Sequence, residues 1–234
     1  MKDFFLGILD WSEVWALIIP LIVLLFNRQQ PTTLKPIIIY VWIAFILNLG
    51  IDIIMVLRDH NLDWIETHFP EWFKTNNPLY NIHSVARFIC FSSYFMHLSP
   101  ASFAKFKKLL AVASVIFIVI NFSIFENFFN PRSFSGNLLA TEAYILLVYC
   151  MLYYLSELKD DSKNLFAGPD FWVVTGLSIY VVINFFVFLF YLPMIDVDED
   201  LAVNIWNVHN IAFIIFCLFI TKGLYGSHRY KYSV

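Results

Sequence analysis

The sequence predicts an all-α, polytopic membrane protein with seven transmembrane helices arranged as three, one and three. Three observations predict this class: the composition, the length of the apolar stretches, and a repeat of polar motifs. Hydrophobic residues make up 60% of the 234 residues, aromatic residues 19% and charged residues 14%. Soluble domains are about 45–50% apolar and about 25% charged. The composition therefore excludes a soluble enzyme, a nucleic-acid-binding protein and a disordered regulator.

Seven stretches are long and apolar enough to cross a bilayer as helices, which takes about 20 residues. Their continuous apolar runs favour helices over barrel strands, which alternate in polarity. Taken in order along the chain, turn-forming pairs separate the stretches at Gln30-Pro31, Asn77-Pro78, Ser99-Pro100, Asn130-Pro131, Gly168-Pro169 and Leu192-Pro193. The predicted spans are 5–26, 36–57, 77–98, 107–125, 136–156, 170–192 and 203–224.

The positions of Lys and Arg predict the orientation, because cytoplasmic loops carry the excess of basic residues. Seven spans place Lys2, Arg58, Lys74 and Arg132 on the side of the N-terminus. The opposite side has Arg28, Lys35, Lys105, Lys107, Lys108, Lys159, Lys163, Lys222, Arg229 and Lys231. We therefore expect the N-terminus outside and the C-terminus in the cytoplasm, in an inner or plasma membrane.

Polar motifs recur at nearly constant spacing, which indicates an internal repeat. Glu13 in the first span matches Glu142 in the fifth at an offset of 129 residues, and Asn81 and His83 in the third match Asn207 and His209 in the seventh at an offset of 126. Trp42 and Asn48 fall more loosely opposite Trp172 and Ser178, at an offset of 130. The alternative is a chance match of short motifs. Duplication divides the chain into a three-helix repeat at 1–98, a linker with the fourth span at 99–134, a second repeat at 135–225 and a cytoplasmic tail at 226–234.

Ionisable residues inside spans are costly, so they are candidate functional residues. Glu13, His83, Glu142 and His209 each lie about two turns from the outer end of their span, which places them at one depth. Asn81 and Asn207 precede the two His by two residues and so lie about 200° round the helix, where we expect them to bond a neighbouring helix.

Arg87 lies one turn below His83, near the membrane centre, where its guanidinium must be paired or hydrated. Asp52 is the expected partner, with Glu13 and Glu142 as competitors. Two interpretations of these polar residues stay open: interhelical bonds that hold the bundle together, or a ligand-binding pocket. The second predicts a pocket for a small polar ligand, a cation or a proton, built from Glu13, Asp52, Asn81, His83, Arg87, Glu142, Asn207 and His209. We assign no catalytic residue, metal ligand or cofactor.

The plan of three, one and three helices resembles the heptahelical group of Pro-Gln-loop transporters and microbial opsins. The resemblance is architectural: Pro20 is followed by Leu21 instead of Gln, and the fifth span has no Pro. Opsins hold retinal on a Lys in the middle of the last helix, whereas Lys222 lies at the cytoplasmic end of this one. We therefore expect no retinal.

Three span openings resemble uncharacterised bacterial seven-span proteins and the membrane input halves of sensor histidine kinases. They are Asn77-Pro78-Leu79-Tyr80-Asn81-Ile82-His83, Pro169-Asp170-Phe171-Trp172 and Trp206-Asn207-Val208-His209. This resemblance implies a sensor that signals to a cytoplasmic partner protein. The alternative is a small-solute or proton-coupled transporter with its site between the two repeats. We expect no enzymatic activity, and a membrane-embedded metallo-enzyme is the third alternative.

Overall fold

The computed structural model describes residues 7–60, 67–68, 70, 75–98, 103–130, 134–158, 168–195 and 197–230. The described residues are helical apart from short connections, and they contain no strand. The long helices are α2 (Ser12–Phe26), α3 (Lys35–His60), α5 (Asn77–His97), α6 (Ala104–Ile120), α7 (Gly136–Glu157), α8 (Pro169–Ile195) and α9 (Glu199–Tyr230). A short 3-10 helix, η1 (Thr32–Leu34), precedes α3, and a π-helical turn, η4 (Asn121–Phe125), extends α6. The expected all-α class is confirmed.

Five helices are long and apolar enough to cross a membrane: Thr32–Arg58, Ala104–Phe125, Gly136–Glu157, Pro169–Tyr191 and Asp200–Gly226. The helix Ser12–Phe26 is apolar but shorter. The helix α5 falls outside this set, and its buried polar side chains (Asn81, His83, Ser84 and Arg87 among them) lower its hydropathy. These helices are those of a multi-pass membrane protein.

The ends of the helices differ from the expected spans where local chemistry extends them. The expected break at Leu192-Pro193 is wrong, because α8 continues through Pro193 to Ile195. A proline near the end of a helix removes one hydrogen bond without having to stop the helix. The last helix begins earlier than expected because the Asp198 side chain accepts a hydrogen bond from Leu201 N at 3.0 Å. It also continues into the expected tail as far as Tyr230.

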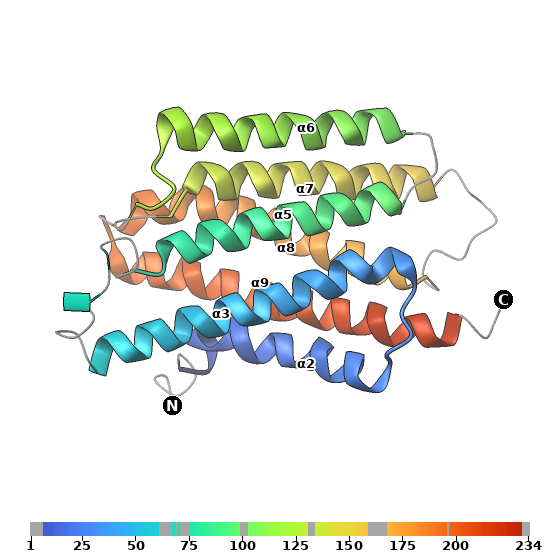
Figure 1. Cartoon of the computed structure of the whole chain (residues 1–234), viewed down its shortest axis with the longest axis horizontal. Helices are drawn as coiled ribbons and strands as arrows, with labels where there is room; N and C mark the ends of the chain where they lie inside the picture. Colours follow the sequence, from blue (N-terminus) through green and yellow to red (C-terminus); the bar gives the residue numbers. More distant parts are fainter. Residues whose placement is uncertain are drawn as a thin grey trace.

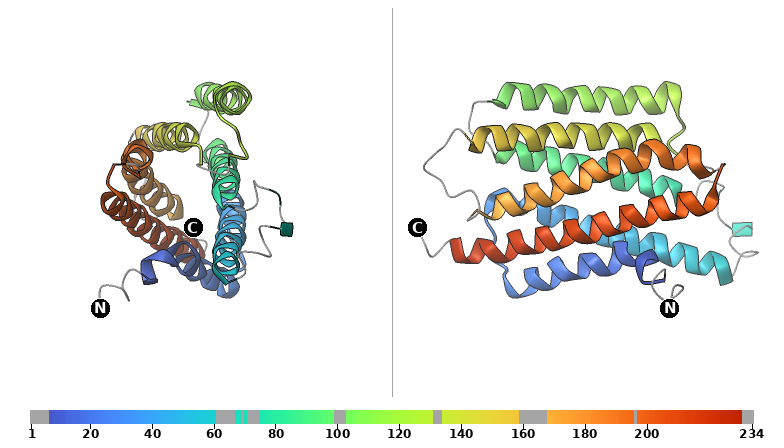
Figure 2. Two further views of the ribbon diagram at one scale, coloured as in Figure 1. Left: turned by 90° about the vertical axis from the view of Figure 1, so that its left-hand side faces the viewer. Right: turned by 180° about the vertical axis from the view of Figure 1, so that it is seen from behind.

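Six helices form a closed ring, in the order α2, α3, α5, α7, α8, α9 and back to α2 (Figure 1; Figure 2, left). The seventh, α6, lies outside the ring and packs against α5 and α7. Its apolar side chains are largely exposed, Leu109 at 62% and Val119 at 59%. An exposed apolar surface of this kind is suited to lipid and not to water.

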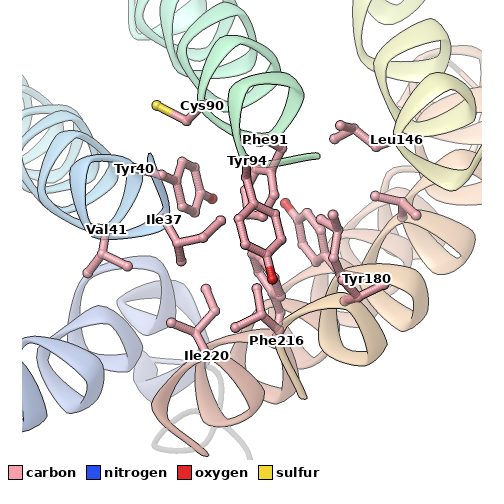
Figure 3. Close-up of a cluster of buried hydrophobic side chains, with 14 of the residues drawn as sticks. Ile37, Tyr40, Val41, Cys90, Phe91, Tyr94, Leu146, Tyr180, Phe216 and Ile220 are labelled. Atoms are coloured by element: carbon pink, nitrogen blue, oxygen red, sulfur yellow. The ribbon is translucent and has the colours of Figure 1, made fainter. Parts of the chain in front are cut away.

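Aromatic side chains fill the middle of the ring. Tyr40, Phe91, Tyr94 and Phe216 are completely buried and come from α3, α5 and α9 (Figure 3). Tyr180 of α8 stacks on Phe216 with ring centroids 5.0 Å apart, and Tyr40 meets Phe91 edge-on at 5.0 Å. Aromatic pairs of this geometry contribute about 0.5–1.5 kcal/mol each beyond the area that they bury.

Candidate functional site

A small cavity lies inside the ring, on the side of this aromatic core where α2, α5, α7 and α9 begin. Its volume is about 20 Å³. Polar side chains from four helices line it: Glu13 of α2, His83, Ser84 and Arg87 of α5, Tyr180 of α8 and His209 of α9. A water molecule needs about 10–15 Å³ of such space. The cavity therefore has room for one water molecule and is too small for a metabolite.

A second group of aromatic rings covers the cavity on its other side. Tyr80, Phe134, Phe188 and Trp206 line it, and Tyr191 packs on Trp206 with ring centroids 4.9 Å apart. The polar side chains thus lie between two aromatic layers, where charges are poorly screened and must be paired.

Arg87 and Glu142 form the first charge pair of the site. Arg87 Nε lies 2.5 Å from Glu142 Oε1, and Arg87 Nη2 lies 2.7 Å from Glu142 Oε2. Ser84 donates its hydroxyl to the same carboxylate, and Arg87 Nη1 donates to the Tyr180 hydroxyl at 2.8 Å. The bidentate geometry and the additional bonds satisfy both charges at a position where neither meets water. Because a guanidinium stays protonated, Glu142 has a permanent counter-charge in Arg87.

Glu13 and His209 form the second pair, with a different chemistry. His209 Nε2 lies 2.9 Å from Glu13 Oε1, and His209 Nδ1 lies 2.5 Å from Asn184 Oδ1. Both partner atoms are acceptors, and this arrangement suits an imidazole with N–H donors on both nitrogens. Rotation of the Asn184 amide would instead present its buried and unbonded Nδ2 to the ring, which suits a neutral imidazole. The pair can therefore hold or release one proton without losing its hydrogen bonds.

His83 lines the same cavity but has a free nitrogen. Its ring stacks on Tyr40 with centroids 6.0 Å apart, and its Nε2 is buried without a hydrogen-bond partner among the described residues. A water molecule in the cavity would satisfy this nitrogen, since buried waters bond to groups that lack a partner.

Four of the predicted residues, Glu13, His83, Arg87 and His209, line this one cavity. Glu142 does not line the cavity itself, but it is hydrogen-bonded to Ser84 and Arg87, which do. The expected pairing of Arg87 with Asp52 is wrong. In the ring, α5 packs between α3 and α7, and Arg87 turns towards Glu142 of α7 and away from Asp52 of α3.

The two predicted asparagines lie outside the cavity. We expected Asn81 to bond a neighbouring helix, but the partners of its side chain, Phe128 and Ser135, precede the first residue of α7. Asn81 holds the connection before α7, donating to Phe128 O at 2.9 Å and accepting from Ser135 N at 2.9 Å. Asn207 is half-buried and does not line the cavity.

The sequence did not indicate three residues that bond to the two charge pairs: Ser84, Tyr180 and Asn184. Asn184 had a usable signal, because an amide inside an apolar span needs a partner helix. Ser84 and Tyr180 had none, since both are ordinary residues in membrane helices. Among the described residues, no three His, Cys, Asp or Glu side chains lie close enough together to hold a metal ion.

Fold and site together define a multi-pass membrane protein with a charged network enclosed in its core. No family model, curated protein or solved structure matches the chain.

Proposed function

We propose that this protein is a seven-span sensor of the cell membrane, with the N-terminus outside, that takes up a proton at the Glu13–His209 pair and signals the change to a cytoplasmic partner protein. The observation that carries the proposal is a titratable pair beside a cavity with room for only one water molecule. Of the ligands that the sequence left open, a proton fits this volume, whereas a polar metabolite does not.

The surrounding charges make the Glu13–His209 pair the titrating element. From α5, Arg87 and His83 face the cavity; from α7, Glu142 reaches it through Arg87; and from α8, Tyr180 contacts His209. Asp52 of α3 interacts electrostatically with Glu13 and with Asp10, which lies just before α2. Glu142 and Arg87 neutralise each other, so the network changes its charge through Glu13 and His209.

An internal repeat with three, one and three helices is supported by the ring. The first helix of each half packs on the third helix of the other half, as α2 does on α9 and α7 on α5. Tyr40 packs on His83, and Tyr180 packs on His209 with centroids 5.8 Å apart. These contacts match Tyr40 of α3 with Tyr180 of α8, an offset of 140 residues. This offset replaces the looser one of 130 residues between Trp42 and Trp172. Such halves would be related by an axis along the membrane normal.

Two contacts between α2 and α9 offer a route for the signal. Glu13 meets His209 at one end, and at the other end Asn27 Nδ2 donates to Leu224 O at 2.9 Å. The contacts are 14 residues apart on α2 and 15 on α9, about 21 and 22 Å of parallel helix. A change of charge at His209 can therefore shift α9 against α2, and α9 continues beyond Leu224 towards the cytoplasmic side.

One observation favours the alternative, a proton-coupled transporter: the cavity lies between the two halves, as substrate sites of transporters do. The sensor is favoured because Tyr40, Phe91, Tyr94 and Phe216 fill the ring between the cavity and the cytoplasmic ends of the helices. A transporter needs a polar path there.

The test uses Trp206, whose ring centroid lies 4.9 Å from that of His209. An imidazolium quenches indole fluorescence more strongly than a neutral imidazole. We expect the fluorescence of the purified protein to fall reversibly as the pH is lowered. Trp206→Phe and His209→Gln should each abolish this transition, and the matched change His97→Gln, at an exposed position, should keep it. A transition that survives His209→Gln would overturn the proposal.

A further inference from the structure

Four buried side-chain oxygens near the outer end of α2 lack hydrogen-bond partners among the described residues: Ser12 Oγ, Asn48 Oδ1, Asp52 Oδ2 and Asn210 Oδ1. Ser12 is fully buried, and Asn48 and Asn210 are each 1% exposed. An unsatisfied buried polar group costs about 1–3 kcal/mol. Several in one region indicate that something else satisfies them.

The two asparagines are oriented by backbone carbonyls in the first turn of α2 and in the helical turn that precedes it. Asn48 Nδ2 donates to Glu13 O at 3.2 Å, and Asn210 Nδ2 donates to Leu9 O at 3.1 Å. Rotating either amide would bring its oxygen against a carbonyl oxygen, so both orientations are fixed. Each Oδ1 atom therefore points away from the carbonyl that its own amide nitrogen bonds, and it lacks a donor.

These groups gather around the start of α2. Asn210 bonds Leu9 O in the helical turn before α2, Asn48 bonds Glu13 O in the first turn of α2, and Ser12 lies between Leu9 and Glu13 in the sequence. Asp52 follows Asn48 by one turn on α3 and so shares its face. Asp10 and Glu13 both act electrostatically on Asp52. A line of acceptor oxygens thus runs from the partly exposed Asp52 to Glu13.

Resting on the proposed function, we infer that Asp52 is the residue through which the proton enters, and that ordered water held by Ser12, Asn48 and Asn210 connects it to Glu13. Water fits these groups because each molecule brings two donors to oxygens that lack them. The partly exposed Asp52 receives the proton from outside, and the waters pass it to Glu13. No covalent bond other than O–H bonds forms or breaks. His209 lies beyond Glu13, while Arg87, His83 and Glu142 lie on the far side of the cavity.

The test is a stopped-flow pH jump in both directions, followed by Trp206 fluorescence. A residue on the entry route changes the rates of uptake and release by one common factor, because the equilibrium does not depend on the route. A residue that acts only through its charge changes their ratio. We expect Asp52→Asn to slow both rates at least tenfold and Ser12→Ala to slow both to a smaller extent. A small weak acid in the buffer, such as acetic acid, should restore the rates of Asp52→Asn.

Two matched variants serve as controls. Asp198→Asn removes the same charge from an exposed position at the start of α9, and Ser114→Ala removes a hydroxyl that bonds Leu110 O. Both should keep the wild-type rates. The inference is overturned if Asp52→Asn keeps these rates, if it changes only their ratio, or if weak acids fail to rescue it. A missing fluorescence transition in the wild type would overturn the proposed function instead.

Discussion

His209 Nε2 lies 2.9 Å from Glu13 Oε1, which joins residues 196 positions apart in the sequence. Glu142 of α7 likewise pairs with a neighbouring helix of the ring, α5, through Arg87. Of the two glutamates, one is thus paired with a histidine, whose imidazole can be neutral or protonated, and the other with an arginine, whose guanidinium stays protonated.

The first prediction concerns the Arg87–Glu142 pair. Glu142→Gln leaves a buried guanidinium without its counter-charge, which costs about 3–5 kcal/mol. We expect the melting temperature in detergent to fall by about 6–20 °C. Arg87→Met should have a similar effect, because it leaves the carboxylate unpaired. The double variant Arg87→Met/Glu142→Leu should lose clearly less than the two single losses together, since no isolated charge remains. Strictly additive losses would contradict the pairing.

The second prediction concerns the tight contact between α8 and α9. A Cβ on Gly176 would lie 2.3 Å from Phe219 Cβ, closer than two carbon atoms can approach. Gly176→Ala should therefore push the helices apart and cost about 1–3 kcal/mol. The same change at Gly50, in the middle of α3, has open space around it. There alanine favours the helix by about 1 kcal/mol. Thermal unfolding should thus move in opposite directions in the two variants.

The sequence predicted the helices better than it predicted their partners. Composition and apolar length were enough for the all-α class, and each expected stretch overlaps one long helix. The polar residues Glu13, His83, Arg87 and His209 could be identified because charge inside an apolar span is rare. In the structure His83, Arg87 and His209 are buried, and Glu13 is partly buried.

The partners could not be predicted because they depend on which helices are neighbours in the ring. Asp52 is closer to Arg87 in sequence than Glu142 is, yet α3 and α7 lie on opposite sides of α5, and Arg87 pairs with Glu142. Asn81 also bonds a connection, and no periodic pattern marks connections. The end of α8 was misplaced because Pro193 is compatible with a final turn.

The third prediction concerns the aromatic layer on the side of the cavity towards which α2, α5, α7 and α9 run. Phe216 is completely buried and contacts the rings of Tyr40, Phe91 and Tyr180. Phe216→Ala would open a space that joins the cavity to the half of the ring beyond this layer, at a cost of about 3–5 kcal/mol. We expect proteoliposomes with this variant to leak protons, measured with a pH dye inside the vesicles, whereas the wild type holds its gradient.

Two controls make the leak interpretable. Phe216→Leu keeps most of the side-chain volume, so proteoliposomes with this variant should hold their proton gradient. A leak in that variant would point to general unfolding. Phe186→Ala makes the same truncation at a side chain that is 55% exposed on α8. Proteoliposomes with this variant should also hold their proton gradient. His209→Gln combined with Phe216→Ala should reduce the leak, because protons would then lose the group that takes them up. A wild type that conducts protons as fast as Phe216→Ala would contradict the sensor and favour the transporter, since the aromatic layer would then not be a barrier.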